Sequence, residues 1–269
     1  MIKILVIGAA GRMGKTIVSC INDTPGVEIA AGTEMPGSPA VGKDVGDVAG
    51  IGPKNVFIGT DLEKALRACD AAIDFSTPES TMETLRHAAR LGKAVVVGST
   101  GFSAEQKKEI SDLCRDLRCV LAPNMSIGVN AVFKISADLA KVLGDAYDVE
   151  IVEAHHKFKK DAPSGTAMRI AEIVAQALGR DLGEVGVYGR QGMTPGRSPK
   201  EIGVHTVRAG DIVGEHRLIF GGMGETVEIV HRAQSRETFA RGAVRAAQWV
   251  AGQPNGLYDM QDVLGLRGK

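Results

Sequence analysis

The chain has 269 residues, of which 44% are hydrophobic and 24% charged, and its 32 basic residues balance 32 acidic ones. This length suffices for two domains of about 100–150 residues each, and the zero net charge argues against a nucleic-acid or membrane-surface partner. No apolar run approaches the roughly 20 residues of a transmembrane helix, and the opening segment is too short for a signal peptide. The four cysteines share no CxxC spacing and are expected to be reduced and buried, so we expect a cytoplasmic protein.

Apolar strands and amphipathic helices alternate through the first half of the chain. The pattern predicts strands at residues 2–7, 27–33, 56–58, 71–75, 94–97 and 120–122, and helices at 12–22, 61–68, 78–91 and 103–115. Continuous apolar runs such as residues 2–7 are typical of central strands in a parallel sheet. The alternation predicts a Rossmann-like, doubly wound α/β domain whose ligand binds beyond the carboxyl ends of the strands.

The first strand leads into a glycine-rich turn, GAAGRMG, from Gly8 to Gly14. The spacing is GxxGxxG, which lets the backbone approach a pyrophosphate at the start of the following helix. Glu34 ends the second predicted strand, where its carboxylate can accept hydrogen bonds from the adenosine ribose. The alternative is a glycine turn that serves only helix–sheet packing. The combination favours a dinucleotide cofactor.

The residues after Glu34 indicate a preference for NADH over NADPH. A carboxylate repels a 2′-phosphate, and Met35 follows it with no basic residue before Lys43. Residues 98–101 and 122–125 also leave predicted strands at the carboxyl edge, where the nicotinamide half of the cofactor is expected. Ser76 and Thr77 occupy a similar position, and there a helix cap and a ligand contact are equally compatible.

The pattern changes after Asn124. Helices are predicted at 130–143, 164–178 and 239–251, strands at 149–154, 204–207, 213–220 and 226–230, and a long loop at 180–203. A run of strands predicts a second α+β domain with an open mixed sheet, and the last helix is expected to return to the first domain. The predicted division is 1–126 with 236–269 for the dinucleotide-binding domain, and 127–235 for the second domain.

The segment EAHHKFKKDAPSGT at 153–166 places seven ionisable side chains within nine positions, directly before a Ser-Gly-Thr helix start. Proton donors beside a helix N-terminus suit a site that protonates an anionic substrate and holds its carboxylates. The adjacent His155 and His156 are compatible with zinc. Since no further ligand follows at suitable spacing, no metal site is predicted.

These motifs resemble the 4-hydroxy-tetrahydrodipicolinate reductase (dihydrodipicolinate reductase) family over nearly the whole chain. The resemblance rests on GAAGRMG at 8–14, DFS at 74–76, EAHHKFKKDAPSGTA at 153–167 and VRAGDIVGEH at 207–216. It implies an oxidoreductase that uses NADH or NADPH to reduce a cyclic imine dicarboxylate to tetrahydrodipicolinate in lysine and diaminopimelate biosynthesis. It also implies a homotetramer that assembles through the sheets of the second, substrate-binding domain.

The resemblance assigns roles to residues of this sequence. It implies that His155 donates or accepts a proton, that Lys159 donates one, and that His156, Gly165 and Thr166 contact substrate. The backbone N–H groups of Ser164, Gly165 and Thr166 are expected to hold the substrate carboxylates. Met35 departs from the arginine that many members carry there for the NADP phosphate, which agrees with NADH preference. The implied cofactor contacts are Gly8, Ala9, Ala10, Gly11, Arg12, Met13, Glu34, Gly98, Ser99, Thr100, Ala122, Pro123, Asn124 and Met125.

Other readings stay open from sequence alone. Lys157 and Lys160 are expected to be solvated or to steer substrate, Asp161 to cap the next helix or orient Lys159, and Glu153 to be structural or an orienting group. A two-domain dehydrogenase acting on an amino acid or aldehyde shares the glycine turn, but is not expected to carry HHxxKxDAPSGT. A nucleotide-sensing regulator needs a DNA-binding element or a strongly basic face, and neither is evident.

Overall fold

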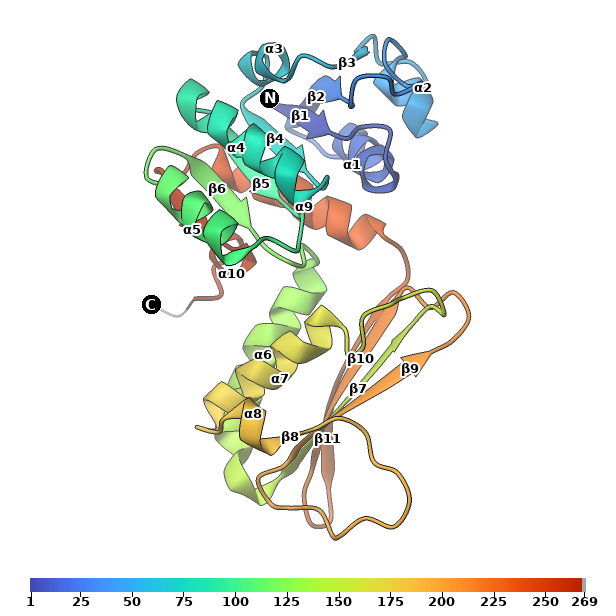
Figure 1. The fold of residues 1–269 in the computed structure, drawn as a ribbon, viewed down its shortest axis with the longest axis vertical. Helices are drawn as coiled ribbons and strands as arrows, with labels where there is room; N and C mark the ends of the chain where they lie inside the picture. Colours follow the sequence, from blue (N-terminus) through green and yellow to red (C-terminus); the bar gives the residue numbers. More distant parts are fainter. Residues whose placement is uncertain (268–269) are drawn as a thin grey trace. The chain divides into compact units, whose positions relative to one another are not determined.

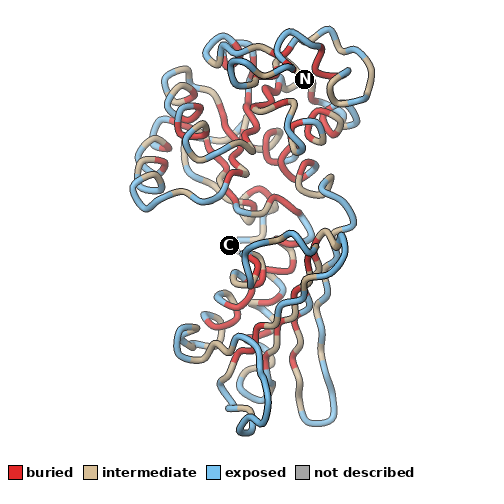
Figure 2. Tube along the Cα trace, turned by 45° about the vertical axis from the view of Figure 1, so that its right-hand side comes forward, coloured by how far each residue is buried: buried red, intermediate tan, exposed pale blue. Residues whose placement is uncertain are grey.

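A computed structural model describes residues 1–267 and divides the chain into two compact units. Unit 1 contains Met1–Ile127 and the segment that begins at Arg236, and unit 2 contains Gly128–Ser235. Buried residues concentrate in the interior of each unit, whereas exposed residues lie mostly at its periphery (Figure 2). Each unit therefore has a core of its own, and the two are described separately.

Unit 1 is built on a parallel sheet of seven strands in the order β12-β6-β5-β4-β1-β2-β3 (Figure 1). The strand order reverses at the neighbouring strands β1 and β4, which is where doubly wound sheets bind their ligands. The strands are β1 (Ile2–Ile7), β2 (Val27–Thr33), β3 (Ile58–Gly59), β4 (Ala71–Asp74), β5 (Ala94–Val97), β6 (Arg118–Leu121) and β12 (Gly256–Tyr258).

Helices cover both faces of this sheet because its side chains alternate between two apolar clusters. Ile4 and Val6 of β1 pack with α1, α2, α9 and α10, whereas Leu5 and Ile7 pack with α3, α4 and α5. The helices are α1 (Arg12–Asn22), α2 (Val45–Ala49), α3 (Leu62–Arg67), α4 (Pro78–Leu91), α5 (Ala104–Leu113), α9 (Glu237–Val250) and α10 (Met260–Val263). The helix α9 thus returns the chain to unit 1, as the sequence predicts.

Unit 2 is a mixed sheet of five strands, in the order β11-β10-β7-β9-β8, with helices packed against one face. The strand β7 lies antiparallel to β10 and parallel to β9, so the sheet combines both pairings. Its elements are α6 (Ile127–Leu143), the 3-10 turn Gly144–Ala146, β7 (Asp148–His155), α7 (Gly165–Ala177), α8 (Leu182–Val185), β8 (Gly186–Val187), β9 (Ile202–Arg208), β10 (Gly214–Gly221) and β11 (Thr226–Ala233). The predicted fold class is confirmed for both halves of the chain.

The structure corrects the expected loop at 180–203, because α8 and β8 lie within it. The sequence also gives no sign of α2, β12 or α10. These elements contain five residues or fewer, which is too short for a helical or strand period to emerge. Among residues 1–267, no helix is long and apolar enough to cross a membrane.

Candidate active site

The predicted cofactor residues of unit 1 gather at one edge of its sheet. Since β1, β2, β4, β5 and β6 run parallel, their carboxyl ends meet at that edge. The segments that follow them hold Gly8 to Met13, Glu34, Gly98 to Thr100 and Ala122 to Met125. The edge has the composition expected of a dinucleotide site, with glycines, backbone N–H groups and one carboxylate.

The glycine-rich turn connects β1 tightly to α1. Gly8 has a φ of +66°, which favours glycine, and an added Cβ at Gly14 would lie 2.1 Å from the carbonyl oxygen of Gly8. The N–H of Ala10 donates to Oε1 of Glu34 over 2.8 Å. This contact fixes the carboxylate beside the turn, where the ribose of a bound dinucleotide is expected.

A pocket of about 830 Å³ opens beside the turn and includes Ala10, Gly11 and Glu34 in its lining. Lys15, Lys43, Asp44 and Asp47 also line it, and none of them was predicted as a cofactor residue. Met35 is 76% exposed and is not among the lining residues. The pocket therefore carries three carboxylates, which repel a 2′-phosphate, and two cations, which attract one.

The segments after β5 and β6 offer mainly backbone groups to a ligand. The hydroxyl of the buried Ser99 lies 2.9 Å from that of Thr81, and the side chains of Ala122 and Met125 are buried in the core. Of the two possible roles at Thr77, the structure shows the cap, since its hydroxyl accepts the N–H of Ser80 over 3.4 Å at the start of α4.

Next to this edge, the carboxyl of Asp74 at the end of β4 is fully buried. Burial raises the pKa of Asp74, although hydrogen bonds from Ser76 oppose that shift. The N–H and hydroxyl of Ser76 donate to Oδ1 over 2.8 and 2.5 Å. Ser76 is thus held by Asp74, which accounts for its polar side chain without a ligand.

The acid–base segment of unit 2 begins on β7, where side chains alternate between the two faces of the sheet. Val149, Ile151, Glu153 and His155 are all buried, so the last two continue the apolar row of the strand beneath the helices. Nδ1 of His155 lies 2.6 Å from Oε2 of Glu153. Burial lowers the pKa of His155 below its ordinary value, while the carboxylate opposes this shift.

Lys159 lies on the loop after β7 and is oriented by Asp161. Its Nζ lies 2.8 Å from Oδ1 of Asp161, and the lysine side chain is only 22% exposed. The hydrogen bond from Lys159 lowers the pKa of Asp161. The orienting role is therefore the one observed, and the alternative of a helix cap is wrong because Ser164 caps α7.

The start of α7 differs in one respect from the expected binding site for the substrate carboxylates. The N–H of Ser164 donates to Oε1 of Glu153 over 3.0 Å, and its hydroxyl accepts the N–H of Ala167. A buried glutamate thus occupies the N–H that was expected to bind a substrate carboxylate. Gly165 and Thr166 follow in the first turn and are more exposed than Ser164.

Three histidines lie in a row across neighbouring strands of unit 2. The rings of His155 and His216 are 5.3 Å apart, and those of His216 and His231 are 6.5 Å apart. Burial, followed by repulsion from His155, lowers the pKa of His216 to about 3. The sequence placed these residues on separate strands but did not show that register makes them neighbours. Within residues 1–267, no group of His, Cys, Asp and Glu is arranged to hold a metal ion.

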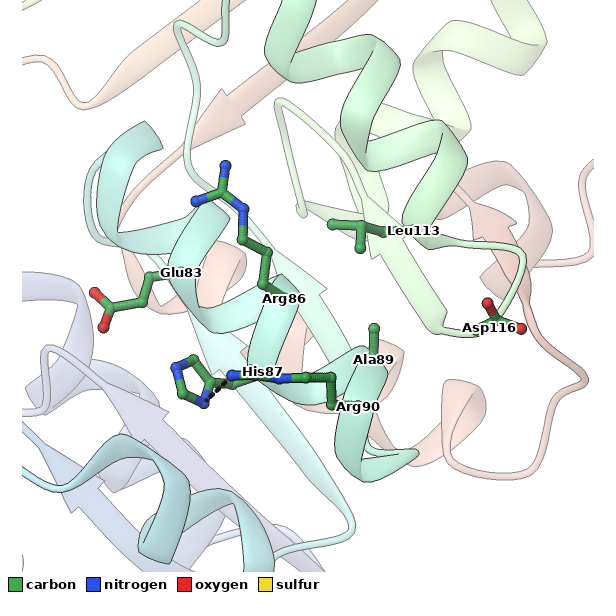
Figure 3. A pocket seen from close by; sticks show the side chains of 7 residues that line it. All are labelled: Glu83, Arg86, His87, Ala89, Arg90, Leu113 and Asp116. Carbon is green, nitrogen blue, oxygen red and sulfur yellow. Dashed lines mark hydrogen bonds between the residues drawn. The ribbon is translucent and has the colours of Figure 1, made fainter.

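A second pocket of unit 1, of about 570 Å³, lies beside α4 and α5 (Figure 3). Its charged side chains are Glu83, Arg86, Arg90 and Asp116, and Arg86 is paired with Glu109 over 2.6 Å. None of the predicted site residues lines it. The pocket thus has no connection to the two groups of residues that carry chemistry.

The comparison with known families matches each half of the chain. The model for "Dihydrodipicolinate reductase, N-terminus" matches residues 2–125, and the model for the C-terminus of the same protein matches residues 128–264. The chain belongs to the dihydrodipicolinate reductase family.

Relatives in this family are similar over their full length. The 4-hydroxy-tetrahydrodipicolinate reductase of Syntrophotalea carbinolica is 54% identical, and that of Geobacter sp. strain M21 is 53% identical; both alignments cover 99% of this chain and 100% of the relative. A dipicolinate-bound dihydrodipicolinate reductase from Paenisporosarcina sp. TG-14 shares the fold, with a TM-score of 0.75, 24% identity and coverage of 97% of this chain and 98% of that one. The family predicted from the sequence is confirmed, and with it an oxidoreductase that uses a nicotinamide cofactor.

Proposed function

We propose that the chain reduces 4-hydroxy-tetrahydrodipicolinate to tetrahydrodipicolinate with a hydride from NAD(P)H and a proton, releasing NAD(P)+ and water, in lysine and diaminopimelate biosynthesis. The observation that carries this proposal is the segment from Glu153 to Thr166. It combines a buried Glu153–His155 pair, a lysine oriented by Asp161, and a helix start. It occurs in a chain more than half identical to reductases of that name.

The cofactor fits the carboxyl edge of unit 1. Gly8 has a positive φ that a side chain would strain, and Gly14 lets α1 approach the carbonyl of Gly8, which an added Cβ would obstruct. Glu34 lines the adjoining pocket. Bound NAD(P)H supplies the hydride. The backbone of Gly8 to Met13 is assigned to the pyrophosphate, Glu34 to the adenosine ribose, and residues 98–100 and 122–125 to the nicotinamide half.

Two side chains of unit 2, Lys159 and His155, are assigned to proton transfer to the substrate. Reduction of the conjugated imine ring leaves negative charge on the substrate, which a cationic donor neutralises. The ammonium group of Lys159, held by Asp161, is assigned to that donation. His155 supplies or relays a proton through its imidazole, which Glu153 holds in place and whose pKa burial keeps below the ordinary value.

The substrate carboxylates are assigned to the first turn of α7, a helix of 13 residues. Backbone N–H groups at a helix start bind anions, and Gly165 has no atom within 4 Å of an added Cβ, so a ligand can approach it closely. Thr166 adds its hydroxyl, and His156 supplies a further contact. Ser164 supports this seat from beneath rather than binding substrate through its N–H.

Turnover with the condensed substrate tests the proposal directly. Purified protein is mixed with NADH and freshly condensed aspartate semialdehyde and pyruvate, and NADH oxidation is followed by absorbance. Oxidation that depends on both precursors is expected. Its absence would refute the assignment, and oxidation of NADH with an amino acid or aldehyde precursor alone would favour the dehydrogenase alternative.

We expect a higher kcat/KM with NADH than with NADPH, because Glu34 repels a 2′-phosphate and Met35 replaces a cation. Lys43→Ala is expected to weaken NADPH binding while leaving NADH binding unchanged, because Lys43 lines the pocket of Glu34. Steady-state kinetics and dissociation constants with both cofactors measure this. A kcat/KM at least about tenfold higher with NADPH than with NADH contradicts the preference. That ratio corresponds to about 1.4 kcal/mol of free energy in favour of NADPH.

A homotetramer is proposed to form through the sheet face of unit 2 that α6 and α7 leave uncovered. Val207 and Val230 on that face are 44% and 39% exposed. Val230→Glu is expected to reduce the molecular mass measured by light scattering, since a charge cannot be buried there without a partner. A wild-type mass of one chain, or an unchanged mass of the variant, contradicts this interface.

We also place the protein in the cytoplasm. All four cysteines, Cys20, Cys69, Cys114 and Cys119, are free and buried, as is typical of a reducing compartment. Fractionation of the source cells tests this, and recovery of the protein outside the cytoplasm would contradict it.

A further inference from the structure

Glu153 is a fully buried carboxylate at the centre of a polar network in unit 2. Arg208 donates to both of its oxygens, over 2.8 Å each, and the hydroxyl of Thr206 donates to Oε1 over 3.2 Å. The N–H of Ser164 and Nδ1 of His155 complete the network, over 3.0 and 2.6 Å. A buried charge persists only with such partners, so the network holds Glu153 ionised and fixed in place.

The pKa of Glu153 agrees with this description. Burial alone would raise the pKa of Glu153, but hydrogen bonds from Arg208, His155 and the Ser164 N–H bring it below its ordinary value. The carboxylate therefore stays negative near neutral pH. Because an ionised carboxylate only accepts hydrogen bonds, the hydrogen between it and the imidazole sits on Nδ1 of His155.

With Nδ1 occupied, Nε2 is the imidazole nitrogen that can exchange a proton. This nitrogen lies beside Gly214, where an added Cβ would stand 3.1 Å from it. Glycine at this position thus leaves room around the atom. Glu153 thus holds the imidazole through Nδ1, while Nε2 lies against the backbone of Gly214.

The same carboxylate also joins His155 to the start of α7. Ser164 donates its N–H to Glu153, caps α7 through its hydroxyl, and places that hydroxyl 3.0 Å from Nε2 of His216. Arg208, which holds Glu153, donates a further hydrogen bond to the carbonyl of Asp161 over 2.7 Å. Glu153 therefore connects the proton donor, the helix start and the loop that carries Lys159.

We propose that Glu153 is a positioning residue for the reduction: it fixes His155 with Nδ1 protonated, so that Nε2 exchanges the proton, and keeps it in register with the start of α7. This inference rests on the proposed function and deepens it. Glu153 acts through His155 and is not itself assigned to the substrate.

The charged groups around His155 determine how the pKa of His155 changes when Glu153 is replaced. The titratable groups that face it are Glu153 on its own strand, Lys159 on the following loop, Arg208 of β9 and His216 of β10, with His231 of β11 behind His216. Burial lowers the pKa of His155, Glu153 opposes this, and Lys159 and Arg208 lower the pKa further. Without the carboxylate, the pKa of His155 is expected to fall.

Glu153→Gln tests the proposal, with Glu150→Gln as its matched control. Glu150 lies on the same strand, also binds two arginines, Arg190 and Arg197, and also contacts a histidine, His205, but has no contact with His155. We expect Glu153→Gln to lower kcat about 10- to 100-fold near neutral pH. The loss should shrink at lower pH, because an acid with a lower pKa is protonated only there. The control is expected to leave the pH profile of kcat unchanged.

Nitrogen NMR of the His155 ring supplies a readout that does not depend on turnover. We expect the neutral wild-type ring to carry its hydrogen on Nδ1, and Glu153→Gln to shift it toward Nε2. If Glu153→Gln fails to fold, Glu153→Asp replaces it, since it keeps the charge but shortens the side chain and draws the carboxylate away from Nδ1 of His155. This variant should shift the pH profile of kcat and the tautomer of His155 in the same direction as Glu153→Gln does.

An unshifted pH profile together with an unchanged tautomer would overturn the positioning role, whatever the variants do to stability. A wild-type protein without reductase activity would instead refute the proposed function. In that case the tautomer comparison still decides whether Glu153 fixes His155.

Discussion

Lys159→Ala is expected to lower kcat by about 10²- to 10⁴-fold, the range that one proton donor contributes. The ammonium of Lys159 is held 2.8 Å from Asp161, and its side chain is largely withdrawn from solvent. Its removal leaves the charge that develops on the substrate without its cationic partner. Because Lys159 belongs to unit 2 and the assigned cofactor residues to unit 1, NADH binding should not change.

Steady-state kinetics and the NADH dissociation constant together check this prediction, with Lys157→Ala as the control. Lys157 is exposed, and its Nζ lies 5.1 Å from the centre of the Phe158 ring. That variant should keep a kcat close to the wild-type value. A near-normal kcat in Lys159→Ala would remove Lys159 from the mechanism, whereas equal losses in both variants would indicate a general effect of positive charge.

The sequence predicted most of the fold because strand and helix periods are local properties. Runs such as Ile2–Ile7 and Ala94–Val97 gave the parallel sheet, and Thr77-Pro78 with Gly92 marked the ends of α4. It failed for elements that exist only through tertiary pairing. The strand β12 is three residues long and is defined by its pairing with β6, more than 130 residues earlier, where Leu257 lies opposite Cys119.

The residue types of the site were visible in the sequence, but their connections were not. The Glu153–His155 contact joins residues two positions apart on one strand face, and this spacing alone did not decide between a structural and an orienting role. The decisive partner, Arg208, is 55 residues away and comes into reach because β9 pairs with β7. The register between β7 and β10 also explains why His216 stands beside His155.

The cofactor pocket shows the same limit in unit 1. The glycine turn and Glu34 follow a pattern that fixed spacing reveals. Neither Lys15, which directly follows Gly14, nor Lys43 was predicted as a cofactor residue, yet both line the pocket that Ala10 and Glu34 share. The two lysines meet the carboxylates of Glu34, Asp44 and Asp47 in this pocket only because the fold brings them together.

Gly14→Ala is expected to weaken NADH binding at least tenfold, and to lower the free energy of unfolding by about 1–3 kcal/mol as overpacking does. The added Cβ would lie 2.1 Å from the carbonyl oxygen of Gly8 and 2.8 Å from the Cα of Ala9. Both contacts are with backbone, so no flexible side chain can move to relieve them. The helix α1 must shift, and with it the N–H groups assigned to the pyrophosphate.

Calorimetric titration with NADH and urea denaturation measure the two effects, and Gly252→Ala is the matched control. Gly252 also belongs to unit 1, but an added Cβ there meets nothing within 4 Å, so neither quantity should change. A Gly14→Ala protein that loses stability yet binds NADH normally would show that the glycine turn serves only helix–sheet packing. If the close approach of α1 to the turn shapes the cofactor site, Gly14→Ala should lose both stability and NADH binding.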